Sequence, residues 1–142
     1  MAIRLRPGVL DHLGLVDALE WYVTDFERRT DVSCVFEHSK VPRVNDNIAI
    51  TAYRITQEAL TNVARHAAAK HVFVTLHAKN KKLMLQVTDD GSGFDQTLLQ
   101  DAEGLGVAFM RERAVLVGGH LDVVSVPENG TTVTFKVPVN GQ

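Results

Sequence analysis

Four polar side chains within nine residues could act together on a phosphorylated substrate. Glu58, Asn62 and His66 stand at positions i, i+4 and i+8 of the segment QEALTNVARHA, with Arg65 beside them. This spacing predicts one polar stripe along a helix. An amide oxygen is a neutral, hard ligand that can complete a Mg²⁺ shell, so Asn62 is a candidate metal ligand. His66 and Arg65 could donate to phosphate oxygens, and Glu58 could orient a water or accept a proton.

The simpler interpretation of this stripe is an exposed helix face with stabilising side-chain pairs, and for Glu58 alone that interpretation is the better one. Two features argue against it for the whole stripe. The stripe lies opposite an apolar face, and Asn62 stands mid-helix, where asparagine has a poor intrinsic propensity. We therefore keep the stripe as a candidate site.

A second candidate is the segment VTDDGSGF, residues 87–94, which ends an alternating apolar run. A hairpin would need one glycine at a position of positive φ, whereas Asp89, Gly91 and Gly93 occupy alternate positions. Glycine backbone, which carries no side chain, next to a carboxylate is suited to the rim of a pocket.

The composition is that of one globular domain. The 142 residues are 45% apolar, enough for one domain that buries about two-thirds of its unfolded surface. Lys and Arg total 15 against 17 Asp and Glu, and we interpret the basic cluster Lys79, Lys81 and Lys82 as a solvated turn, so no nucleic-acid partner is expected. The single cysteine excludes an internal disulfide, and no Cys/His spacing resembles a zinc site.

The sequence also gives an expectation about location. No apolar run approaches the ~18 residues of a membrane span, and the start MAIRLRPG lacks the apolar core of a signal peptide. We expect a cytoplasmic domain without direct membrane contact, whose parent protein could be anchored in the inner membrane.

Hydrophobic periodicity predicts the elements that must position the candidate residues. The expected helices are residues 15–26, 45–66 and 107–117, and Asn45 is the expected N-cap of the second. The expected strands are residues 31–38, 71–78, 82–89, 120–126 and 131–137. The last four pair in two hairpins, with turns at 79–81 and at PENG, residues 127–130, where Asn129–Gly130 suits a tight turn. Residues 95–106 have no clean period and are expected to form a mobile loop.

These elements predict an α+β fold: a two-layer α/β sandwich, with helices on one face of the sheet and the other face partly open. Two common nucleotide-binding motifs are excluded. The pattern GxxxxGK[ST] is absent. Gly104 and Gly106 begin a GxG pattern, but Phe109 stands where the third glycine of a dinucleotide-binding fingerprint belongs.

Four motifs together resemble the ATP-binding catalytic domain of bacterial sensor histidine kinases, in the GHKL superfamily shared with gyrase and MutL. They are Glu58–His66 as the N-box, Asp89–Gly93 as DxGxG, Gly104–Gly106 as the lid glycines and Gly130–Val133 as GTxV. Three local sequence patterns are similar to those of the subfamily that includes nitrate/nitrite sensors. They are ExLTNxxRH, the MRER after Gly106 and the LRPxxLDxLGL-like start. The resemblance covers nearly the whole chain and implies a Bergerat-type fold with a mixed, mostly antiparallel sheet.

The resemblance implies ATP as a cofactor and assigns the adenine end of its site. Asp89 would accept a hydrogen bond from the adenine amino group. Gly91 and Gly93 would let the backbone come close to the nucleotide, where a β-carbon would intrude. The hydroxyl of Thr131 would support the adenine end.

For the phosphate end, the resemblance implies Mg²⁺ as a second cofactor. Asn62 would hold the metal, Glu58 would be the catalytic base or water-orienting residue, and Arg65 and His66 would lie near the phosphates or the lid. The implied lid residues are Gly104, Leu105 and Gly106. Val107 and Phe109 depart from the small residue and leucine that are usual in this subfamily, which leaves the packing of the lid open.

A histidine kinase also needs a phosphoacceptor histidine on a helical hairpin, followed in this subfamily by an acidic residue. None of the six histidines is followed by one. We therefore expect an excised domain, with residues 1–13 as the end of a linker from a missing dimerisation and phosphoacceptor domain and residues 14–142 as the catalytic domain.

The resemblance implies a protein-histidine kinase module of a two-component pathway. It would transfer the γ-phosphate of ATP to a histidine of its own dimerisation domain, with a response regulator downstream. Two alternatives share the pocket: an anti-sigma-factor-like serine kinase, and a module that senses adenine nucleotides without catalysis. The LRPxxLDxLGL-like start favours the histidine kinase over the serine kinase. The presence of Glu58 and Asn62 argues against a nucleotide sensor without catalysis.

Overall fold

The structure of the protein is a computed structural model that describes residues 8–93 and 106–139. The elements in chain order are α1 (Gly8–Thr30), β1 (Ser33–His38), α2 (Asp46–Asn62), the π-helical turn η1 (Val63–Ala67), β2 (His71–Lys79), β3 (Lys82–Asp89), α4 (Val107–Leu116), β4 (His120–Val126) and β5 (Gly130–Pro138). All three expected helices and all five expected strands are present, with ends shifted by a few residues.

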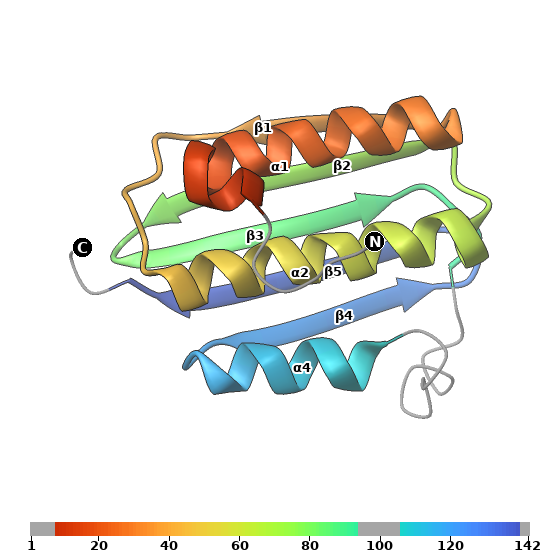
Figure 1. The fold of residues 1–142 in the computed structure, drawn as a ribbon. Helices are drawn as coiled ribbons and strands as arrows, with labels where there is room; N and C mark the ends of the chain where they lie inside the picture. Colours follow the sequence, from red (N-terminus) through yellow and green to blue (C-terminus); the bar gives the residue numbers. More distant parts are fainter. Residues whose placement is uncertain (1–7, 94–105, 140–142) are drawn as a thin grey trace.

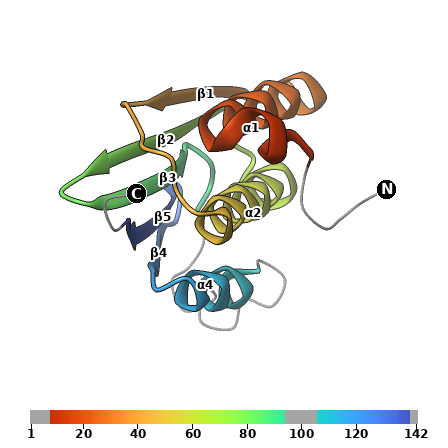
Figure 2. The same ribbon diagram turned by 60° about the vertical axis from the view of Figure 1, so that its left-hand side comes forward.

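The elements form two layers. The five strands make one sheet in the order β1-β2-β3-β5-β4, in which only the β1–β2 pair is parallel. Figure 2 shows α1, α2 and α4 together on one face of this sheet. The predicted two-layer sandwich with a mixed, mostly antiparallel sheet is confirmed.

The sheet alternates between a buried and an exposed face, as period-two side-chain geometry requires. The helix-facing residues include Val74, Leu85 and Phe135, which are 0 to 1% exposed, and they pack against helix residues such as Ile55. On the outer face, Phe73 is 50% exposed. The expectation of a partly open face is therefore confirmed.

Two local features shape the first two helices: a glycine that breaks α1 and a side chain that caps α2. In α1 the helical geometry is broken at Gly14, which has φ 80° and ψ 176°, a conformation that glycine adopts far more easily than other residues. Asn45 caps α2 as predicted, because its side-chain oxygen accepts a hydrogen bond of 2.9 Å from the backbone N–H of Ile48.

The end of the second helix differs from the prediction. A regular helix would carry Glu58, Asn62 and His66 on one stripe, but α2 ends at Asn62 and the chain continues as the π-helical turn Val63–Ala67. A π-helical turn is wider than an α-helical one, so it shifts the residues that follow out of the α-helical phase. The helix thus ends earlier than predicted, and the alignment of the His66 side chain with Glu58 and Asn62 stays a prediction.

The two hairpins have different turns. Asn80 and Lys81 both have positive φ, 55° and 62°, as a two-residue type I′ turn between β2 and β3 requires. The β4–β5 turn lies within the predicted segment PENG, residues 127–130, but it is longer than a two-residue turn. Val126 pairs with Gly130, so three residues connect the strands, and positive φ occurs at Glu128 and Gly130.

Candidate functional site

The two sequence motifs meet at one end of the sheet. Figure 1 shows that the C-terminal end of α2, the end of β3, the start of β5 and the start of α4 all lie at the same end of the molecule. The fold therefore brings the N-box, the DxGxG segment and the GTxV segment to the same end of the sheet, although they are far apart in the sequence.

Three polar residues lie side by side in one cross-strand row. Thr88 pairs with Thr132 and Ser125 pairs with Thr131, which puts Asp89, Thr131 and Ser125 next to one another on β3, β5 and β4. All three face the helices and are at most 8% exposed. Elsewhere this face of the sheet is apolar, so the row forms a buried polar floor.

Asp89 is a buried hydrogen-bond acceptor. Its Oδ1 accepts a bond of 2.8 Å from the N–H of Gly91, and its carboxylate accepts a second bond from the N–H of Thr131. Burial raises the pKa of Asp89 above its ordinary value despite these two donors. Asp89 forms no ion pair within residues 8–93 and 106–139. A carboxylate has several lone pairs, so Asp89 could accept a further hydrogen bond.

Two glycines hold the strand ends together around Asp89. A β-carbon at Gly130, which has φ 89°, would lie 2.0 Å from the carbonyl oxygen of Asp89. A β-carbon at Gly93 would lie 2.1 Å from the carbonyl oxygen of Val126. For Gly93, the close neighbour in the structure is thus protein backbone of the β4–β5 connection. The N–H of Glu128 also donates to the carbonyl of Ser92 across this contact.

Asp90 ties the DxGxG segment to the start of β2. Its Oδ1 accepts from the backbone N–H groups of Lys70 and His71, each at 2.9 Å, and its Oδ2 lies 2.7 Å from Nδ1 of His71. These donors, chiefly the N–H of His71, hold the pKa of Asp90 at about 2. No separate role was predicted for Asp90 from the sequence. Its position directly after Asp89 was the only available signal.

Glu58 lies against the beginning of α4. A β-carbon at Gly106, which has φ 66°, would lie 2.5 Å from Oε2 of Glu58. Asn62 follows Glu58 by one helical turn and is half-buried, whereas Arg65 in η1 is exposed. The close approach of Glu58 to Gly106 was not predicted from the sequence.

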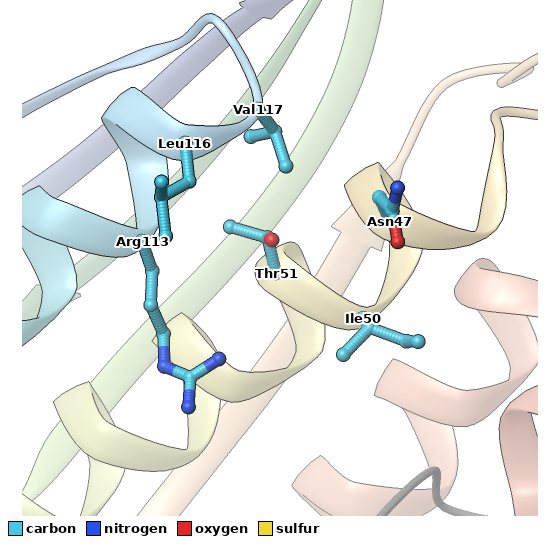
Figure 3. A pocket seen from close by; sticks show the side chains of 6 residues that line it. All are labelled: Asn47, Ile50, Thr51, Arg113, Leu116 and Val117. Carbon is cyan, nitrogen blue, oxygen red and sulfur yellow. The ribbon is translucent and has the colours of Figure 1, made fainter.

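A groove runs between α2 and α4 from this point. Figure 3 shows its far part, a cavity of about 260 Å³ lined by Asn47, Ile50, Thr51, Arg113, Leu116 and Val117. A second cavity of about 280 Å³ adjoins Glu58 and is lined by Arg54, Gln57, Glu58, Thr61, Phe109 and Arg113. The Arg113 guanidinium lies 4.3 Å from the centre of the Phe109 ring, a cation–π contact at the position where the sequence departs from its subfamily.

The remaining predictions have mixed outcomes. Gly104, Leu105 and the rest of the expected lid loop lie outside the described residues, and of His66 only the backbone path is described. In the described part of the chain, no three His, Cys, Asp or Glu side chains are grouped as metal ligands. No helix there is long and apolar enough to cross a membrane. Ser125 was missed, although a serine in the buried phase of strand HLDVVSV was a usable signal.

The similarity of this chain to known proteins identifies its family. Residues 47–141 match the family model described as "Histidine kinase-, DNA gyrase B-, and HSP90-like ATPase". The chain belongs to this ATPase family. A relative, the "Signal transduction histidine-protein kinase/phosphatase DegS" of Brevibacillus brevis, is 36% identical over 136 residues, which are 95% of this chain and 35% of the relative. The chain thus spans about a third of that protein's length.

Solved structures agree on the fold of this ATPase domain. The histidine kinase domain of the blue-light-activated histidine kinase of Erythrobacter litoralis EL346 superposes with a TM-score of 0.72 at 21% identity, covering 88% of this chain and 61% of the other. The ATP-binding domain of PrrB from Mycobacterium tuberculosis gives a TM-score of 0.66 at 18% identity, covering 88% and 93%. The resemblance and the Bergerat-type fold expected from the sequence are confirmed.

The Gly130 contact yields a stability prediction with an internal control. Gly118→Ala strains a similar backbone, φ 79°, but its β-carbon would meet nothing within 4 Å, so it should cost about 1 kcal/mol. Gly130→Ala adds a collision with the Asp89 carbonyl and should cost at least about 2 kcal/mol. Chemical denaturation of both variants tests this. Equal losses would show that strand ends can separate without penalty.

Proposed function

We propose that this chain is the ATP-binding catalytic domain of a sensor protein-histidine kinase, which presents the γ-phosphate of ATP to a histidine on a separate helical domain. The observation that carries the proposal is the buried carboxylate of Asp89, held by two backbone N–H groups and bordered by the hydroxyl-bearing Thr131. The 36% identical relative is named as a histidine-protein kinase/phosphatase, which supports the choice of histidine as acceptor.

The adenine end of the site would be selected by hydrogen-bond chemistry. Adenine presents an amino group that can donate to the carboxylate of Asp89. Guanine presents a carbonyl at the equivalent edge, so two acceptors would face each other, at a cost of about 1 to 3 kcal/mol. Because Asp89 is buried, water cannot easily relieve that conflict.

The phosphate end would use the residues at the end of α2. Mg²⁺ keeps several waters and commonly takes only one or two protein ligands plus substrate phosphates, so the single amide oxygen of Asn62 fits the donor set. When bound, the metal would neutralise charge that develops on the transferred phosphoryl group. Glu58, one turn earlier and beside Gly106, would orient or deprotonate the attacking group. Arg65 and His66, with the lid residues Gly104, Leu105 and Gly106, would lie near the phosphates.

The proposal extends to the domain boundaries, the partners and the location of the protein. The break of α1 at Gly14 coincides with the boundary expected between a linker, residues 1–13, and a catalytic domain, residues 14–142. The partners would be the dimerisation and phosphoacceptor domain of the same kinase and a downstream response regulator. The domain would work in the cytoplasm, without contact to nucleic acid or membrane.

The first functional prediction concerns the base. The domain should bind ATP more tightly than GTP, by about tenfold or more. Asp89→Asn should remove most of that preference, because an amide presents donors where the carboxylate has only acceptors. Isothermal titration calorimetry with both nucleotides measures this. Equal affinity of the wild type for ATP and GTP would contradict the adenine assignment.

A second prediction concerns the metal. Asn62→Ala should weaken ATP binding in the presence of Mg²⁺, by about 1 to 2 kcal/mol, because the amide oxygen acts through the ion. With a chelator present, wild type and variant should bind ATP equally. Thr61→Ala, on the same turn, is the matched control. A loss of the same size with and without Mg²⁺ would make Asn62 a structural residue.

The phosphotransfer itself requires the larger protein. In the parent kinase, Glu58→Gln should slow phosphorylation about a hundredfold or more while ATP affinity changes little. The product should carry an acid-labile, base-stable phosphoryl group. An acid-stable product on a small protein would favour the serine kinase alternative, and no product with any acceptor would favour nucleotide sensing.

A further inference from the structure

Ser125 is a buried polar residue that none of the nucleotide-binding motifs includes. It lies in β4 on the helix-facing side, between the apolar residue Val123 and the end of the strand, and is 4% exposed. Its Oγ lies 2.7 Å from Oγ1 of Thr131 and 3.4 Å from the carbonyl oxygen of Gly130. Ser125 therefore contacts the residue that borders Asp89.

These contacts constrain the hydroxyl protons. A hydroxyl has one proton to donate and two lone pairs to accept with, whereas a carbonyl oxygen can only accept. If Ser125 donates to Gly130, the short contact of 2.7 Å must be filled by the proton of Thr131. The order of donation is then Thr131 to Ser125 to the Gly130 carbonyl. Thr131 Oγ1 keeps its lone pairs for a ligand and has no proton to offer it.

We propose that Ser125 is a specificity-determining residue, which makes the Thr131 hydroxyl an acceptor beside the Asp89 carboxylate. The inference rests on the proposed adenine site. Two acceptors would then face the base, directly or through one water. This arrangement suits the two N–H donors of the adenine amino group and opposes the carbonyl of guanine. Ser125 acts through Thr131 and need not touch the nucleotide.

The test is the ratio of ATP to GTP affinity in Ser125→Ala. Without Ser125, the Thr131 hydroxyl can rotate and donate to the guanine carbonyl. The preference for ATP should fall about three- to tenfold, chiefly through tighter binding of GTP. Ser125→Thr keeps a hydroxyl at this position and should keep the preference. Val123→Ala, which truncates a buried neighbour on the same face of β4, should lower the melting temperature and leave the ratio unchanged.

A double-mutant cycle isolates the mechanism. Thr131→Val removes the hydroxyl that Ser125 orients, so adding Ser125→Ala to it should not change the ratio further. If the wild type prefers ATP and Ser125→Ala leaves that preference intact, this inference is overturned and the proposed function stands. If the wild type shows no preference between ATP and GTP, the adenine assignment fails, and the inference about Ser125 fails with it. A change in the ratio that persists in the Thr131→Val background would also overturn it.

Discussion

The contact between the start of β5 and the end of β3 determines the arrangement of the site. Because Gly130 has no side chain, its backbone can lie directly on the carbonyl of Asp89. That contact sets the register in which Thr131 stands beside Asp89 and Ser125 beyond it. A slip of one residue would turn every side chain of β5 to the other face of the sheet. The polar floor and the apolar core behind it therefore depend on the same register.

Placing a carboxylate on the helix-facing side of a sheet has an energetic cost. Burial raises the pKa of Asp89, which means that its charged form is less stable in the folded chain than in water. The neighbouring rows on this face are filled by valines, leucines and a phenylalanine, among them Val87, Leu85 and Phe135. The structure thus confines the polar residues on this face of the sheet to the end of an apolar layer.

The sequence predicted what depends on local patterns and missed what depends on contacts. Alternation and helical periodicity located the elements, and the motifs pointed to Asp89, Asn62 and Glu58 as candidate site residues. The π-helical turn after Asn62 could not be foreseen, because no residue type specifies it and the chain leaves it through Ala68 in the left-handed conformation, φ 51°. The approach of Glu58 to Gly106 depends on how α4 packs beside α2, which no spacing in the sequence reveals.

The tips of the two hairpins differ in whether they could accept inserted residues. Hairpin tips are ordinarily the places where a chain accepts extra residues. The β4–β5 tip is fastened to the DxGxG segment through Glu128, Ser92 and the backbone around Gly93, so lengthening it would disturb the candidate site. The Asn80–Lys81 tip lies at the opposite end of the sheet and is exposed. In a lineage of such domains, additions of sequence would be tolerated at that tip, where a new binding segment or a fluorescent reporter could be carried without touching the site.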